Sequence, residues 1–394
     1  MRDVVVVGYA RTPMGRFGGG LAEVPAVELG GRAIAGALAA AGLHTSAVDQ
    51  VVMGHVLQAG QGQITARQAA VAASVGMEVP AETINTVCLS GMTALSRARD
   101  LIRVGDAEVV VAGGMESMSR APYVLDRARF GYRLGDGALI DVLQHDGLTC
   151  AFDGCAMGLA TDDYQRAKDL RISRAAQDQW AARSHARAAT AWDTGAFDGE
   201  VVPVSVPQRR GAPVEVARDE GVRTDATVGK LGELRPAFTP EGTITAGNAS
   251  QISDGAAALV LAGRDTAERM GLEVLATLTS WAAVAGPDPS LHLQPAVAIR
   301  AAAARVGADP AGFDRYEINE AFASVAIASV RELGLDEDRV NEVGGAVALG
   351  HPIGCSGARL VVSLIHALRR RGGGTGAAAL CGGGGQGNAM TVAV

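Results

Sequence analysis

The sequence predicts an α/β fold made of two halves of similar plan that flank an inserted segment. Short β-branched runs alternate with longer alanine-rich stretches, the alternation breaks between residues 121 and 247, and it resumes after Gly271. Such alternation is typical of βα units stacked on a shared sheet. At 394 residues with 48% hydrophobic content, the chain is long enough for more than one core and too apolar to be disordered.

The first half alternates regularly. The expected strands are Val4–Val7, Val51–Met53, Thr83–Val87 and Glu108–Ala112, and the expected helices are Val27–Ala41, Thr65–Ser74 and Ser90–Arg103. The last of these strands is expected to end in the pair Gly113-Gly114. In the inserted segment, residues 166–192 predict one helix, and residues 201–216 predict an extended stretch interrupted by proline.

The second half repeats the pattern. Its expected strands are Val274–Thr279, Arg315–Ile318, Ala377–Leu380 and Ala389–Val394, and its expected helices are Ala296–Arg305, Ala321–Leu333 and Ser356–Arg370. Ser90-Gly91 and Ser356-Gly357 each open a helix that leads to a strand ending at or just before a glycine, which predicts two pseudo-repeated βα layers. We therefore expect one half at residues 1–120 and 248–270, an insertion at 121–247 and a second half at 271–394.

Composition narrows the class of protein. A net charge of −7 argues against a nucleic-acid or membrane-surface protein, and no stretch reaches the roughly 18 apolar residues of a membrane span. The five cysteines form no CxxC pair, so neither a disulfide framework nor a zinc site is indicated. The chain opens directly with a strand-like run and lacks the pattern of a signal peptide. We expect a soluble cytoplasmic protein without a metal or redox cofactor.

The 52 glycines predict many tight turns, and one glycine-rich motif invites a cofactor hypothesis that fails. CGGGGQG, from Cys381 to Gly387, formally contains G-x-G-x-x-G. A dinucleotide-binding motif must follow a first strand, open a helix and precede an acidic residue about 20 positions on. Only seven residues follow Gly387, so this interpretation is excluded.

Four residues are candidates for chemistry because each lies at a predicted strand end or helix start. Cys88 precedes the helix that Ser90-Gly91 opens, where unpaired N–H groups stabilise a thiolate, although taken alone a buried, inert cysteine is the simpler interpretation. Cys381 precedes four glycines that allow close approach of a ligand to the backbone. Asn319 follows a strand, and His351 lies in a glycine-punctuated loop, where a structural loop histidine is the alternative.

These positions also carry a family resemblance. NTVCLSGM, INEAFA, NEVGGAVALGHPIGCSGAR and LCGGGGQG resemble the signature segments of thiolases, the CoA-dependent acyl transferases. The resemblance extends from VVVVGYARTPMGRFGG to the final strand. It implies a layered α/β/α/β/α core with an inserted loop domain that binds CoA.

The resemblance also implies a role for each candidate residue. Cys88 would take an acyl group from a CoA thioester, and His351 would accept the proton of Cys88. Cys381 would remove the α-proton of acetyl-CoA so that the carbanion attacks the acyl group. Enolate charge would fall on His351 and on a water held by Asn319. Backbone N–H groups of Cys88 and Gly383 would hold the tetrahedral oxyanion.

Binding residues follow from the same resemblance, with acyl-CoA and coenzyme A as substrates and no further cofactor. Ser250 matches a position beside the pantetheine arm, and Arg223 a position at the nucleotide end of CoA. The remaining substrate positions are Leu148, Met157, Phe238, Ala246, Ala321 and Phe322.

The inserted segment bears on the subtype. Residues 129–154 resemble the loop that joins two dimers in biosynthetic thiolases, which implies a homotetramer. Two departures from the family pattern, Cys155-Ala156-Met157-Gly158 and His292-Leu293-Gln294-Pro295, flank the acyl site. We therefore expect acyl chains longer or more branched than acetoacetyl.

Three alternatives compete with a biosynthetic thiolase. A degradative thiolase with medium-chain or branched substrates is the close alternative, and a non-catalytic CoA-binding protein of the same fold is the distant one. The distant alternative would have lost a nucleophile or base, whereas all four positions are present. A ketoacyl carrier-protein synthase would carry a second histidine where this chain has Cys381.

Overall fold

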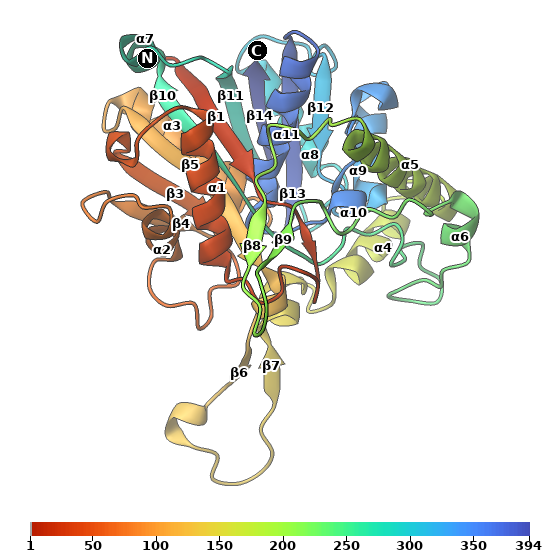
Figure 1. Ribbon diagram of the computed structural model, residues 1–394. Coiled ribbons are helices and arrows are strands. Elements are labelled where there is room, and N and C mark those ends of the chain that lie inside the picture. Colours follow the sequence, from red (N-terminus) through yellow and green to blue (C-terminus); the bar gives the residue numbers. More distant parts are fainter. Residues whose placement is uncertain (1) are drawn as a thin grey trace.

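The computed structural model describes residues 2–394 and contains one mixed sheet that spans both halves of the chain (Figure 1). Its strand order is β12-β13-β14-β11-β1-β10-β5-β3-β4, with the short strand β2 paired to β10. The strands of the first half are β1 (Val4–Arg11), β2 (Gly15–Arg16), β3 (Gln50–Gly54), β4 (Ala81–Ile84), β5 (Val109–Ser117) and β10 (Ser253–Gly263). Those of the second half are β11 (Ala276–Ala285), β12 (Arg315–Ile318), β13 (Thr375–Gly382) and β14 (Gln386–Ala393).

Helices cover both outer faces and fill the space between the halves. The helices of the first half are α1 (Ala26–Ala40), α2 (Thr65–Ala72), α3 (Ser90–Val104) and α7 (Arg264–Met270). The second half contains α8 (Gln294–Ala304), α9 (Ala323–Leu333), α10 (Ala346–Leu349) and α11 (Ser356–Arg370). The insertion contributes α4 (Met157–Ala167), α5 (Arg174–Asp193) and α6 (Val228–Gly232), and the hairpins β6 (Tyr123–Leu125) with β7 (Leu139–Asp141) and β8 (Val204–Val206) with β9 (Val214–Val216).

Three apolar cores confirm the layered α/β/α/β/α arrangement. Leu95 of α3 and Leu364 of α11 pack in one buried cluster with strand residues of both halves, so these two helices form the middle layer. A second cluster joins α1 and α2 to the opposite face of the first-half strands. A third joins α8 and α9 to the second-half strands. Because side chains alternate between the two faces of a strand, each half of the sheet packs against the shared middle layer on one face and against its own outer helices on the other.

The middle layer depends on two glycines at equivalent places of the repeat. A Cβ on Gly357 would lie 2.4 Å from the backbone nitrogen of Met92, and one on Gly91 would lie 2.8 Å from that of Ala358. Both glycines follow the serine that opens α3 or α11. The helices therefore meet at their N-terminal turns, which brings the segments carrying Cys88 and His351 close together.

Three expectations for the elements were wrong. Sequence patterns missed β10, an alanine-rich strand buried along its whole length between β1 and β5. Strand β5 does not end at Gly113-Gly114 but runs through both glycines to Ser117. The single helix expected at 166–192 is two helices, because Asp169 and Arg171 have positive φ between α4 and α5.

A buried ion-pair cluster fastens the insertion to the sheet. Arg11, the last residue of β1, is fully buried and its guanidinium contacts Glu200 at 2.5 Å and Asp219 at 2.7 Å. Two carboxylates pair with one guanidinium, so the cluster carries one net negative charge. A buried N–H group helps to stabilise that charge, because the N–H of Met14 donates to Asp219 at 2.8 Å.

The hairpin of β6 and β7 forms an arm that projects from the body of the molecule (Figure 1). Its tip exposes two large apolar side chains: Phe130 is 87% exposed and Leu134 is 99% exposed. Among residues 2–394, no helix is both long enough and apolar enough to cross a bilayer.

Candidate active site

Cys88 lies in a tight turn directly before α3. The preceding Val87 has φ of +53°, a conformation that a β-branched residue rarely adopts, and the hydroxyl of Ser90 holds the turn by donating to the Val87 carbonyl at 2.6 Å. Burial raises the pKa of the Cys88 thiol to about 12, while hydrogen bonds from the backbone N–H groups of Gly383 and of Cys88 itself lower it. The glycine-rich turn of the second half thus places an N–H group on the Cys88 sulfur.

His351 follows α10, and a hydrogen bond to its imidazole ring fixes the side chain. Its Nδ1 lies 2.5 Å from Ser356 Oγ, and that hydroxyl lies 2.9 Å from the Pro352 carbonyl oxygen. Because a carbonyl only accepts, the hydroxyl donates to Pro352 and accepts from Nδ1–H. This assignment leaves Nε2 without a proton. Burial lowers the pKa of His351 to about 3, with a further contribution from the charge of Arg359, so the imidazole is neutral at pH 7.

Asn319 faces the free nitrogen of that ring. It follows β12, is fully buried, and its Nδ2 lies 3.4 Å from His351 Nε2. Its Oδ1 is also buried and has no hydrogen-bond partner among residues 2–394. An orphaned buried amide oxygen fits a site that holds a water or a ligand.

Cys381 lies near the end of β13 and is 1% exposed. Burial raises the pKa of its thiol, and the charge of Cys88 raises it further, because the two sulfurs lie close to one another. Its side chain packs with Leu291 and Ala321 on an apolar wall that Met157 and Phe322 extend. Both thiols are therefore protonated at rest.

The side chains of Cys88, His351 and Cys381 line one cavity of about 60 Å³. The predicted residues that line it are Cys88, Leu148, Met157, Ser250, Ala321, Phe322, His351, Cys381 and Gly383. Ser250 is held against the wall because its N–H donates to the Ala321 carbonyl at 3.0 Å. Cys88, Met157 and Gly383 also line an adjoining outer hollow that reaches Phe152 and Gly384.

Four predicted residues lie outside the lining of this cavity. Asn319 lies behind His351. Phe238 is 38% exposed and stacks edge-on against Phe322, with ring centroids 6.5 Å apart. Ala246 is exposed. Arg223 is exposed as well, and its backbone N–H donates to His185 Nδ1 at 3.1 Å.

Sequence reasoning missed several members of the site. Ser356 was interpreted only as the start of a helix, and its contact with His351 becomes visible only when the loop closes. Gly147, Leu291 and Ile353 also line the cavity. Leu291 directly precedes the segment that begins at His292 and departs from the family pattern, and Ile353 follows Pro352 in the loop of His351. Both residues are therefore next to segments that the sequence had singled out.

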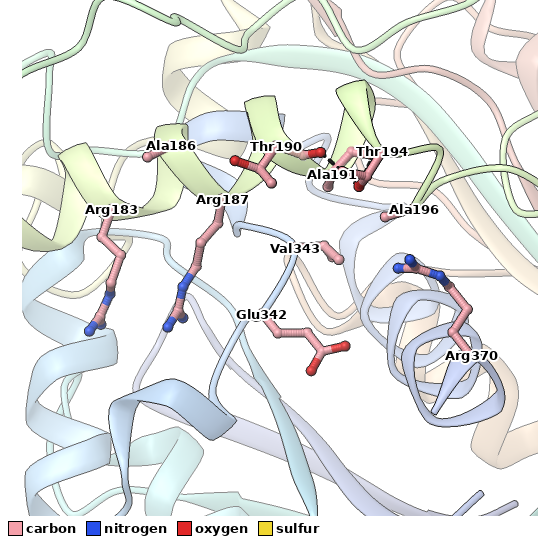
Figure 2. Close-up of a pocket in the computed structure, with 10 residues that line it drawn as sticks. All are labelled: Arg183, Ala186, Arg187, Thr190, Ala191, Thr194, Ala196, Glu342, Val343 and Arg370. Carbon is pink, nitrogen blue, oxygen red and sulfur yellow. Dashed lines mark hydrogen bonds between the residues drawn. The ribbon is translucent and has the colours of Figure 1, made fainter. Parts of the chain in front are cut away.

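A second hollow, shown in Figure 2, lies between α5, the loop of Glu342 and the end of α11. It is lined by arginines but by no nucleophilic cysteine or histidine. Arg183 pairs with Glu337, and Arg187 pairs with Asp338 and donates to the Val340 carbonyl at 2.7 Å. Each of these two guanidinium groups thus already has a carboxylate partner, whereas the cavity described above is lined by Cys88, His351 and Cys381.

Comparison with known proteins identifies the family of this chain. The family described as "Thiolase, N-terminal domain" matches residues 4–265, and that described as "Thiolase, C-terminal domain" matches residues 272–394. The chain belongs to the thiolase family. This thiolase is 50% identical to the "Probable acetyl-CoA acetyltransferase" of Mycolicibacterium smegmatis, over 98% of this chain and 100% of that protein.

Two further relatives cover essentially the whole length of this thiolase. The "Acetyl-CoA acetyltransferase" of Cupriavidus necator is 47% identical over 100% of this chain and 99% of that protein. The crystal structure of the Bacillus anthracis acetyl-CoA acetyltransferase superposes with a TM-score of 0.96 at 41% identity, covering 100% of this chain and 99% of that chain. The likeness in sequence and fold to these relatives therefore extends over the whole chain.

Proposed function

We propose that this thiolase joins acetyl-CoA to an acyl group by Claisen condensation, and cleaves 3-ketoacyl-CoA in reverse, through an acyl-Cys88 intermediate. The observation that carries the proposal is that Cys88, His351 and Cys381 line one cavity, with the Gly383 N–H on the Cys88 sulfur. The names of the relatives, acetyl-CoA acetyltransferases, support the same chemistry.

In the first half-reaction, His351 Nε2 accepts the proton of Cys88, and the thiolate attacks the thioester carbonyl. A neutral imidazole is the required starting state, and the lowered pKa of His351 supplies it. The N–H groups of Gly383 and Cys88, which contact the Cys88 sulfur, would then hold the charge that develops on the carbonyl oxygen. Each such donor is worth on the order of 3 kcal/mol in the transition state. Coenzyme A leaves as the thiol, taking the proton from His351.

In the second half-reaction, the Cys381 thiol passes its proton to His351 Nε2, and the resulting thiolate removes a proton from the α-carbon of acetyl-CoA. The raised pKa of this thiol makes the thiolate a strong base once it is formed. The carbanion attacks the acyl carbonyl, the bond to Cys88 breaks, and Cys88 leaves as a thiolate that takes the proton from His351, with 3-ketoacyl-CoA as product. His351 and a water on the free Oδ1 of Asn319 stabilise the enolate oxygen. Both cysteines must stay reduced, which agrees with a cytoplasmic location.

Mass spectrometry after incubation with acetyl-CoA tests this assignment. We expect one acetyl group on Cys88 in the wild type and in Cys381→Ala, and none in Cys88→Ala. Deuterium exchange at the methyl group of acetyl-CoA should persist in Cys88→Ala and disappear in Cys381→Ala. A wild-type protein that stays unacetylated, or exchange that survives without Cys381, would remove the support for these roles.

The apolar wall beside Cys381 determines which acyl groups the cavity accepts. Met157, Leu291 and Phe322 form an apolar surface against Cys381, and Ala156 offers only a methyl group beside them. We propose that acyl chains longer or more branched than acetoacetyl fit here, as in a degradative thiolase. Thiolysis rates with acetoacetyl-CoA and with medium-chain 3-ketoacyl-CoAs test this, and a strict preference for acetoacetyl-CoA would contradict it.

We propose a homotetramer in which the arm of β6 and β7 joins two dimers. Exposed apolar side chains at the tip, Phe130 and Leu134 above all, need a partner surface in water. Light scattering should show a tetramer for the wild type and a dimer for the double variant Phe130→Ser with Leu134→Ser. A wild-type dimer would overturn this arrangement.

A further inference from the structure

We infer that Glu320 is a positioning residue that fixes the side chains of Asn319 and His351 relative to each other. This inference rests on the function proposed above. Glu320 directly follows Asn319 and is 1% exposed. Nothing in the chemistry of the reaction requires a carboxylate at this place. Its surroundings show what it does instead.

The carboxylate accepts four hydrogen bonds from buried neutral donors. Oε1 accepts from Trp180 Nε1 at 2.9 Å and from Asn341 Nδ2 at 3.0 Å. Oε2 accepts from Ser184 Oγ at 2.7 Å and from the backbone N–H of Val347 at 3.0 Å. Within residues 2–394 no lysine, arginine or histidine pairs with it. Only an acceptor with two oxygens satisfies all four donors.

Two of these donors belong to segments that position Asn319 and His351, the catalytic pair. The side chain of Asn341 also accepts from the Ile318 N–H at 2.9 Å and donates to the Ile318 carbonyl at 2.8 Å, which fixes the backbone just before Asn319. Val347 belongs to α10, the turn that leads to His351. Glu320 is therefore bonded to both segments whose side chains must meet at Asn319 Nδ2 and His351 Nε2, 3.4 Å apart.

The other two donors come from the insertion. Trp180 and Ser184 lie on α5, and Ser184 Oγ also accepts from the Gly345 N–H at 2.9 Å. A Cβ on Gly345 would lie 2.3 Å from the Glu320 carboxyl carbon, so only glycine lets the loop close on this carboxylate. The insertion thus contributes to the geometry of the catalytic pair without lining the cavity at these residues.

The decisive variant is Glu320→Gln, which keeps the shape and turns one acceptor oxygen into an NH₂ group facing donors. We expect kcat per acetylatable Cys88 to fall at least about tenfold, as a loss of preorganisation predicts, with KM for the CoA thioesters within about twofold of wild type. Counting acetylated Cys88 by mass corrects for any misfolded fraction. A wild type that is never acetylated contradicts the proposed function, whereas an acetylated wild type with an unaffected variant contradicts only this inference.

Matched variants separate positioning from simple stability. Glu342→Gln changes a nearby half-buried glutamate that pairs with Arg315, and should leave kcat unchanged. Trp180→Phe and Ser184→Ala each remove one donor and should give smaller losses of kcat at constant KM. If Glu320→Gln does not fold, these two variants decide. A kcat within threefold of wild type in Glu320→Gln, or in both single-donor variants where only those fold, overturns the inference.

Discussion

Ser356 determines which nitrogen of His351 can act as a base. Its hydroxyl is committed as a donor to Pro352, so it accepts from Nδ1–H and leaves Nε2 free. The sequence placed His351 correctly in a glycine-punctuated loop, but no local pattern shows that a helix-opening serine will reach back to the ring. The position of His351 in this loop was thus predictable, and the group that fixes its tautomer was not.

Substituting Ser356→Ala tests this role. Without the acceptor, the Nδ1 proton is no longer favoured, and we expect kcat to fall by about tenfold to a hundredfold, the range typical of groups that orient a ligating or catalytic histidine. Steady-state kinetics on the acetylatable fraction provide the measurement. Ser363→Ala on the same helix is the control, because Ser363 Oγ is buried without a hydrogen-bond partner in the described chain. Equal effects in both variants would argue against a role in the tautomer.

At the scale of elements, strands and helices with clear periodicity were predicted well, whereas the buried strand β10 was missed. Strand β12 and helix α11 have the bounds that the sequence suggested. Strand β10 is buried on both faces and has the composition SDGAAALVLAG, without alternation of polar and apolar residues. A run of this kind cannot be told from a buried helix by periodicity alone. Only its pairing with β1 and β5 defines it.

The contact between α3 and α11 gives a prediction at this scale. In Gly357→Ala the new methyl group would meet the Met92 backbone at 2.4 Å, and backbone cannot move aside as a flexible side chain can. We expect the free energy of unfolding to fall by about 2 kcal/mol or more, typical of overpacking. Gly232→Ala is the control, since a Cβ there meets nothing within 4 Å. Denaturant titration measures both, and equal stabilities would contradict the close contact.

At the scale of the whole molecule, buried neutral histidines couple folding to pH. Burial lowers the pKa of His292 to about 4 and of His185 to about 4, below the ordinary 6.5. Both His292 ring nitrogens are buried without partners among the described residues. Between pH 6.5 and 4 the unfolded chain binds a proton that the folded imidazole does not, so this contribution to stability is complete above pH 6.5 and is lost as the pH falls.

His292→Leu should therefore flatten the acid limb of the stability curve. The gain relative to wild type on moving from pH 7.5 to pH 4 should be on the order of 3 kcal/mol, from the size of the shift in the pKa of His292. Thermal unfolding across this pH range measures it. His145→Leu, at a side chain 66% exposed, should leave the slope as in wild type. A parallel curve for His292→Leu would show that this imidazole is protonated in the folded state.

The two halves of the sheet meet at a narrow seam, where β1 pairs with β11 only at Val5 with Thr277 and at Val6 with Ala276. Cys88 lies on one side of this seam, whereas Asn319, His351 and Cys381 lie on the other. During synthesis Cys88 therefore leaves the ribosome well before His351 and Cys381. Under the mechanism proposed above, acyl transfer needs all three side chains, so it can begin only after the last strands have docked.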